Sequence, residues 1–186
     1  MTTRNLKQPH NPPKPKRESH SWLSLFFIES QAMLKTIDMS EQIEAIKKKF
    51  GRDFYRDPKA MQEAAQVWGV EYNSGGAPIK LKRETLVEFG HCKGEMSYVE
   101  TTKGYVLLGM NASTSIGGFG YAPSIWDGVG FASYWDARAC AVEKLINYFE
   151  KETASTNSCS SLANKHSAMR VVQFLREEMT PQLELF

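Results

Sequence analysis

The sequence predicts an α+β protein: an antiparallel three- to four-stranded sheet with a packed helix, flanked by N-terminal helices and a C-terminal helix. Two observations carry this prediction. Apolar residues recur at helical spacing before residue 69 and again after residue 133. The stretch between them consists of short segments rich in β-branched and aromatic residues, separated by glycine-containing dipeptides. Helices on either side of a run of strands are typical of the α+β class.

The first helix is predicted over residues 38–50. One face of it is apolar, with residues at helical spacing: Met39, Ile43, Ile46 and Phe50. Asp38 and Glu41 have the spacing of a capping box, and Gly51 can close the C-terminus.

A second helix is predicted between Asp57 and Gly69. Asp57 is a suitable N-cap, Pro58 fits the first helical position, and Gly69 ends the apolar periodicity. The two helices form a helical lead-in to the strands, and the loop over residues 73–78 separates them from the sheet.

A three-stranded meander is predicted from Lys80 onward. The strand segments are residues 85–92, 95–101 and 105–113. The dipeptides Lys93-Gly94 and Lys103-Gly104 are predicted as tight turns. Residues 117–131 contain five glycines and form either a fourth strand or a wide loop against the sheet.

Two helices follow the strands. Ser133 caps a helix that extends to residue 152 and carries one apolar stripe: Ala137, Cys140, Ala141, Leu145, Tyr148 and Phe149. A final helix is predicted over residues 162–179, and Thr180-Pro181 stops it.

The chain therefore divides into five predicted parts. They are a basic disordered tail (1–21), the helical lead-in (22–79), the α+β core (80–152), a polar linker (153–161), and the C-terminal helix with a partner-binding tail (162–186). Within residues 22–79, Trp22–Ile28 is apolar but too short for a membrane helix, and Glu29 follows it in place of a signal-peptide cleavage site.

Residues 1–21 carry five basic residues against one acidic residue, and they contain four prolines. Such a segment cannot bury enough apolar surface to order itself. It is either a solubilising tail or an arm that binds nucleic acid through Lys14, Lys16 and Arg17. Because Met33 and Met39 are also candidate start sites, the sequence leaves open whether residues 1–32 are translated.

The remaining residues are close to neutral, with 18 basic and 20 acidic side chains, which disfavours a broad phosphate-binding face. The three cysteines, Cys92, Cys140 and Cys159, form no CxxC pair, so neither a zinc site nor a disulfide framework is predicted. The composition is that of a cytoplasmic protein without a membrane span, and it leaves the oligomeric state open.

No catalytic motif is found, and the chain is predicted to be non-catalytic, with no cofactor and no metal site. The adjacent residues His91 and Cys92 are the remaining candidate pair for an enzyme, but neighbours on a strand point to opposite faces. The glycines of residues 117–120 lack the Lys-Ser/Thr and the helix start of a phosphate loop.

Aromatic residues are concentrated between residues 119 and 135. Those proposed as an interface are Phe119, Tyr121, Trp126, Phe131 and Trp135. They could stack on single-stranded bases, anchor a protein interface, or fill the core between sheet and helix. No Lys or Arg lies between Lys103 and Arg138, which disfavours nucleic acid at this segment.

The last residues contain the most specific motif. Gln182, Leu183, Leu185 and Phe186, with Glu184 between them, resemble the Gln-Leu-x-Leu-Phe peptide by which bacterial replication and repair proteins bind the DNA polymerase sliding clamp. The resemblance implies that Gln182 hydrogen-bonds at the rim of the clamp pocket, while Leu185 and Phe186 enter its apolar cleft. Glu184 departs from the usual Ser or Asp. The alternative is that these residues pack on the body of the protein.

The body resembles HicB-type antitoxins and small phage or plasmid accessory proteins, in having a short meander, a Gly-Pro loop and an alanine-rich helix. This likeness carries over no residues. The predicted function is a protein-binding accessory or inhibitor that acts on DNA replication or defence machinery, with the sliding clamp as first candidate partner. The alternatives are a nucleic-acid-binding module and an antitoxin-like regulator.

Overall fold

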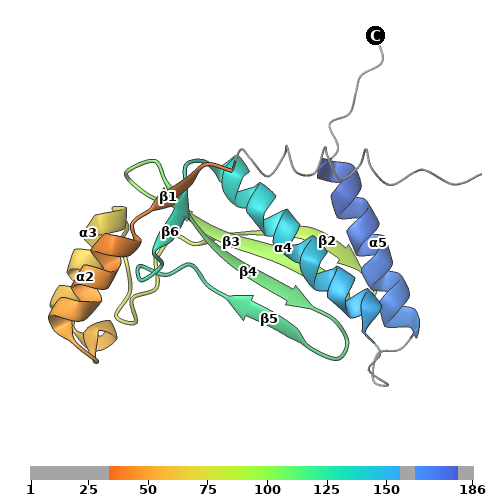
Figure 1. The fold of residues 1–186 in the computed structure, drawn as a ribbon, viewed down its shortest axis with the longest axis horizontal. Helices are drawn as coiled ribbons and strands as arrows, with labels where there is room; N and C mark the ends of the chain where they lie inside the picture. The colour runs from red at the N-terminus through yellow and green to blue at the C-terminus, as the bar shows by residue number, and fades with distance from the viewer. Residues whose placement is uncertain (1–33, 156–161, 180–186) are drawn as a thin grey trace, which may run out of the picture. The chain divides into compact units, whose positions relative to one another are not determined.

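The computed structural model describes residues 34–155 and 162–179. In this part of the chain, an antiparallel sheet is preceded by one pair of helices and followed by another, so the α+β prediction is confirmed (Figure 1). The strands are β1 (Thr36–Asp38), β2 (Lys82–Phe89), β3 (Cys92–Glu100), β4 (Val106–Ser113), β5 (Gly118–Tyr121) and β6 (Val129–Phe131). Their order is β1-β6-β4-β3-β2, and β5 also pairs with β4.

The described sheet has six strands, which is wider than the three or four expected. Residues 117–131 supply both β5 and β6, with a loop between them. Strand β1 lies inside the segment assigned to the helical lead-in and pairs with β6. Both β1 and β6 have three residues, too few for an alternating apolar pattern to stand out in the sequence.

The helical lead-in consists of α2 (Ser40–Phe50), a 3₁₀ turn (Phe54–Arg56) and α3 (Pro58–Trp68). Asp57 caps α3 as predicted, because its side chain accepts hydrogen bonds from the backbone N–H groups of Lys59 and Ala60. Gly69 ends α3 in the left-handed conformation.

The predicted capping box at the start of α2 is wrong. Asp38 belongs to β1, and its carboxylate accepts from the N–H of Ser40, two residues on, at 2.8 Å. Met39 occupies the cap position without a side-chain cap bond. The pairing of β1 with β6 sets the backbone of Asp38, so this residue bonds its neighbour in a local turn rather than the third residue of the helix.

The first turn of the meander lies at Gly90-His91, and the predicted turn at Lys93-Gly94 is wrong. Phe89 pairs with Cys92, and Gly90 has a φ of 57°, which glycine adopts without strain. Gly94 lies inside β3, where a Cβ would come within 2.8 Å of a methyl group of Leu145. The second predicted turn, at Lys103-Gly104, is confirmed by Gly104 at a φ of 81° between β3 and β4.

The two C-terminal helices are α4 (Tyr134–Ala154) and α5 (Leu162–Met179). Ser133 caps α4, since its side chain accepts a bond from the N–H of Asp136. The predicted stripe of α4 packs on the sheet: four of its residues are fully buried, and Cys140 and Tyr148 are partly buried against the same cluster.

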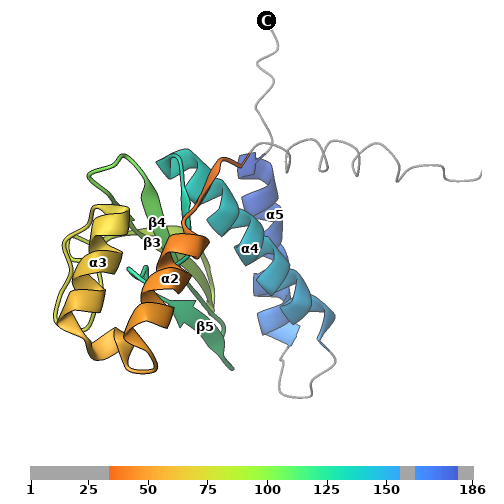
Figure 2. The ribbon, with the colours of Figure 1, turned by 60° about the vertical axis from the view of Figure 1, so that its left-hand side comes forward.

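The sheet carries apolar side chains on both faces. On the face covered by α4 and α5, strand β4 contributes Val106, Leu108, Met110 and Ala112. Leu107 and Val99 point to the opposite face and join a second cluster with α2 and α3, which lie at the β1–β6 end of the sheet (Figures 1 and 2). Successive side chains of β4 enter different cores because side chains along a strand point alternately to opposite faces of the sheet.

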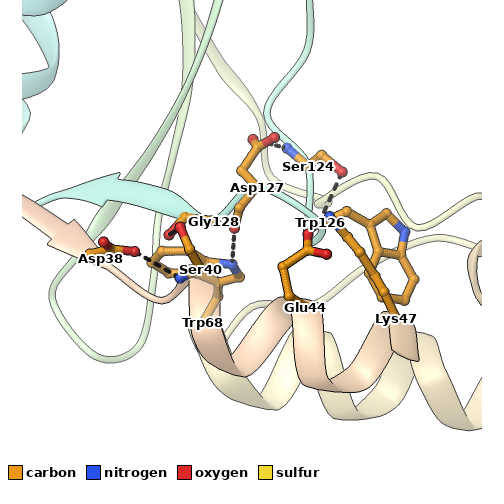
Figure 3. A network of polar contacts seen from close by, with 9 residues as sticks. All are labelled: Asp38, Ser40, Glu44, Lys47, Trp68, Ser124, Trp126, Asp127 and Gly128. Atoms are coloured by element: carbon orange, nitrogen blue, oxygen red, sulfur yellow. Dashed lines mark hydrogen bonds and ion pairs between the residues drawn. The ribbon is translucent and has the colours of Figure 1, made fainter. Parts of the chain in front are cut away.

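A turn over Ser124–Gly128 joins α2 and α3 to the sheet (Figure 3). Trp68 is fully buried, and its indole Nε1 donates to the carbonyl of Asp127 at 3.0 Å. The carbonyl of Gly128 accepts from the N–H of Met39 at 2.7 Å. Asp127 folds the turn by accepting from the N–H of Ser124 at 2.8 Å, and burial raises the pKa of this carboxyl.

Replacement of Trp68 by Phe is expected to lower the free energy of unfolding by about 1–3 kcal/mol, because it removes the bond to Asp127 and leaves part of the pocket empty. Urea denaturation measures the change. Trp135→Phe is the matched control, since Trp135 is 72% exposed, and we expect it to change stability by less than about 0.5 kcal/mol. Equal losses from the two variants would contradict the role given to Trp68.

Gly109→Ala is expected to destabilise the protein by about 1–3 kcal/mol through overpacking. A Cβ at Gly109 would lie 2.6 Å from each of three atoms, in Pro123, Ser97 and Tyr121. At Gly117 a Cβ would meet nothing within 4 Å, so Gly117→Ala is the control and should stay within about 0.5 kcal/mol of the native protein. Thermal unfolding of both variants measures the change in stability. If Gly109→Ala left the stability unchanged, the close contacts of Gly109 with Pro123, Ser97 and Tyr121 would not constrain β4.

Candidate partner-binding site

The structure does not bring the five aromatic residues proposed as an interface together on one surface. Phe131 is only 7% exposed and lies in the core between the sheet and α4. Trp126 packs against the other core, with its ring centroid 4.7 Å from that of Phe54. These two side chains stabilise separate cores.

Phe119 and Tyr121 lie on β5 and face α4. The ring of Phe119 is 5.0 Å from that of Tyr148, and the Tyr121 hydroxyl accepts from the Lys144 amine at 3.2 Å. Tyr121 remains 42% exposed. These two residues therefore belong to the margin of the sheet, where helix α4 covers them in part.

Trp135 is the most exposed of the five, with 72% of its surface accessible. It lies in the first turn of α4, and its ring contacts Tyr134 edge-on at 5.0 Å between centroids. Tyr134 in turn contacts Tyr98 of β3 at 5.2 Å. We name the group Tyr98, Tyr134, Trp135 and Arg138 the Trp135 surface. Trp135 is exposed, whereas the other three side chains are half-buried. Trp, Tyr and Arg are the residue types enriched at the energetic centres of protein interfaces.

Hydrogen bonds and ion pairs among Tyr134, Arg138, Glu84 and Glu178, which we call the clasp, fix this surface. The Tyr134 hydroxyl donates to one carboxylate oxygen of Glu84 in β2 at 2.5 Å, and Arg138 Nε pairs with the other at 3.3 Å. The guanidinium of Arg138 also reaches Glu178 near the end of α5 at 3.1 Å. Three elements that are distant in the sequence are thus held together by one arginine and two glutamates.

The clasp perturbs the phenol of Tyr134. Partial burial, with the hydrogen bond to the Glu84 carboxylate as the second cause, raises the pKa of Tyr134 to about 12. Tyr134 is therefore a neutral hydrogen-bond donor at physiological pH. The hydrogen bond that it donates to Glu84 joins α4 to β2.

The clasp also joins the end of α5 to the start of α4. Helix α5 runs antiparallel to α4, so its end at Met179 lies at the Tyr134 end of α4 (Figure 2). The residues with the clamp-binding pattern, Gln182, Leu183, Leu185 and Phe186, lie outside the described residues, as do Lys14, Lys16 and Arg17 of the basic arm. In the sequence, this pattern begins three residues after Met179, the last residue of α5.

The opposite face of the sheet offers a second, weaker candidate. A hollow of about 290 Å³ is lined by residues that include Arg83, Ser97 and Asn111. Glu95 in this hollow is already paired with Lys93 at 2.9 Å and with Asn111 at 3.2 Å, and the bond from Lys93 holds the pKa of that carboxyl below its usual value. A larger hollow, of about 670 Å³, lies on α4 and α5 and is lined by residues that include Glu150, His166 and Arg170. We place the candidate site at the Trp135 surface because it gathers the side-chain types that dominate protein interfaces.

His91 and Cys92 do not form a catalytic pair. His91 is exposed in the turn between β2 and β3, whereas Cys92 is fully buried in the core. Burial raises the pKa of the Cys92 thiol, so it is not a thiolate at neutral pH. In residues 34–155 and 162–179, no group of three or more His, Cys, Asp or Glu side chains is placed to hold a metal ion.

No helix in the described ranges combines the length and apolar character that a membrane span requires. No protein-family model, curated protein or solved structure matches this chain.

Glu84, Arg138 and Glu178 were missed at the sequence level. Arg138 is 54 positions from Glu84 and 40 positions from Glu178, and no local sequence pattern indicates that they are in contact. Taken singly, each charged residue resembles an ordinary solvated side chain. Helical periodicity gives no signal for the exposure of Trp135, which lies within about 20° of the buried Val142 and Ile146 around the helix. Its exposure follows from its position in the first turn of α4, at the end of the helix.

Tyr134→Phe tests the clasp through the pH dependence of stability. The folded-state pKa of Tyr134, about 12, lies above its ordinary value of 10, so its contribution is complete below pH 10 and is lost between pH 10 and about 12. Chemical denaturation across this range should show the native protein losing more stability than the variant. Parallel pH profiles for the two proteins would contradict the assignment.

Proposed function

We propose that this protein is a non-catalytic accessory or inhibitor protein of a bacterium, phage or plasmid, acting in the cytoplasm on DNA-replication or defence machinery. Its C-terminal peptide tethers it to the sliding clamp. The observation that carries this proposal is the pattern Gln182-Leu183-Glu184-Leu185-Phe186, placed directly after the helix-stopping Pro181.

The chemistry of the peptide suits a reversible tether. Burying Leu183, Leu185 and Phe186 in an apolar cleft contributes about 1.5–3 kcal/mol for each side chain. Ordering the peptide and the loss of rotational freedom offset part of this gain. The net result is a weak to moderate affinity, which permits exchange between partners.

The geometry of the body supports a second contact beside the tether. The clasp holds Glu178, one residue before the end of α5, against Arg138 of the Trp135 surface, and Trp135 is 72% exposed. A partner that holds the peptide is thereby brought close to the Trp135 surface. The tether would supply attachment, and the Trp135 surface would then contact either the same partner or a second one.

The tether is tested by the affinity of the full chain for a purified bacterial sliding clamp, measured by isothermal titration calorimetry. We expect a dissociation constant in the micromolar range, and a loss of at least about tenfold in the Leu185→Ala, Phe186→Ala double variant, because each lost 1.4 kcal/mol is tenfold. Glu184→Ser is the matched control. It restores the residue usual at that position and should bind as well as the native chain.

Trp135→Ala separates the two contacts. It should weaken clamp binding only if the Trp135 surface touches the clamp itself, and it should leave the contribution of the peptide intact. Absence of clamp binding by the native chain, or equal binding by the native chain and the double variant, would contradict the proposed tether.

The alternative function is nucleic-acid binding, favoured by the excess of basic residues in positions 1–21. It requires retention on single-stranded DNA that falls steeply with salt and is lost when residues 1–21 are deleted. Since no Lys or Arg lies between Lys103 and Arg138, the aromatic segment alone would not replace the arm.

A further inference from the structure

The strands at the edges of the described sheet, β1, β2 and β5, differ in how they are protected, and β1 has only three residues. The edge formed by β2 carries charged side chains and a register shift between Thr85 and Val87, and it contacts α5. Its charged residues are Lys82, Arg83, Glu84 and Glu88. Charges, bulges and a covering helix are the devices by which proteins prevent one sheet edge from pairing with another.

Strand β5 has neither charges nor a register shift, and α4 covers it only in part, at Phe119 and Tyr121. Its residues Gly118–Tyr121 carry no charge, and no Lys, Arg, Asp or Glu occurs anywhere from Tyr105 to Trp126. Its register with β4 is regular, and in the described part of the chain β4 is the strand that pairs with it. Figure 1 shows β5 at the margin of the sheet, where Ile116 and Tyr121 are 47% and 42% exposed.

The hydrogen-bonding direction of β5 follows from its hairpin with β4. The N–H of Thr114 donates to the carbonyl of Gly117 at 2.7 Å, which closes the hairpin. Bonded and non-bonded pairs alternate along an antiparallel ladder, so the backbone groups of Phe119 and Tyr121 face β4. Those of Gly118 and Gly120 point outward, and both glycines are exposed.

We propose that β5 is a homodimerisation edge, at which β5 of a second copy pairs antiparallel about a two-fold axis at Phe119. In this register the outward backbone groups of Gly118 and Gly120 bond those of Gly120 and Gly118 of the other copy. Phe119 lies opposite its own equivalent. A two-fold interface must be complementary to itself, and a strand without charges meets this condition because no like charges oppose each other.

The arrangement joins the two sheets into one and brings the two Phe119 rings together on the side of α4, beside Tyr148. A strand of four residues gives a small contact, so the dimer is expected to be reversible and concentration-dependent. This inference does not rest on the proposed function. If both hold, each dimer presents two C-terminal peptides, which raises the avidity for a partner with two clefts.

Disulfide trapping tests the register in the full chain, with Cys140 and Cys159 replaced by Ser and the buried Cys92 retained. Opposed residues of a non-bonded pair have Cα atoms about 4.5 Å apart, within disulfide range, so Phe119→Cys should form a covalent dimer on mild oxidation. Tyr121→Cys is the matched control. In the proposed register its equivalent lies about 13 Å away along the strands, and it should not cross-link.

Sedimentation equilibrium of the native chain tests the association itself. The average mass should rise with concentration from 21.1 kDa towards twice that value. Gly120→Pro, which removes the outward N–H donor, should abolish the rise, and circular dichroism checks that it remains folded. A mass of 21.1 kDa at all concentrations, a dimer that Phe119→Cys does not trap, or equal cross-linking at 119 and 121 would each overturn the proposal.

Discussion

Strand β4 is the constraint on which the rest of the described structure depends. It pairs with β3 along its whole length, and its other edge is divided between β6 at Val106 and β5 from Met110 onward. Its first five residues are all buried, because one face supports α4 and the other supports the core with α2 and α3. Gly109 is required at its centre, where the backbone before β6 crosses at close range. A strand that is buried on both faces over its first five residues, with one edge fully paired and the other partly paired, leaves little freedom for its neighbours.

The position of the candidate site follows from this arrangement. Since α4 lies across β4, its first turn projects beyond the buried stripe and exposes Trp135, while Arg138 one turn later reaches both β2 and α5. The clasp is partly exposed, so its contribution to stability is modest. Its more important effect is positional, because it holds Glu178 near the end of α5 against Arg138, one turn after the exposed Trp135.

Local signals in the sequence predicted the parts of the fold that local chemistry determines. Asp57, Pro58 and Gly69 define α3, and Ser133 starts α4, because capping depends on residues close in sequence. The first turn was predicted at Lys93-Gly94 because Gly90 and Gly94 lie close together and either glycine could form a tight turn. The turn forms at Gly90 because Gly94 is needed inside β3, where it packs under Leu145, and the sequence alone does not reveal this long-range contact. The strands β1 and β6 and the clasp around Arg138 depend in the same way on long-range pairing, which one sequence does not reveal.

We propose that the body of the protein presents Trp135 and that the C-terminal peptide alone is sufficient to attach the protein to its partner. The most direct measurement is competition: a synthetic peptide of residues 180–186 is titrated against a complex of the full chain with the sliding clamp. The account predicts that the peptide displaces the full chain, while the same peptide with Ala at positions 185 and 186 does not. A complex that resists displacement by the native peptide would show that the body holds the partner, and it would contradict the claim.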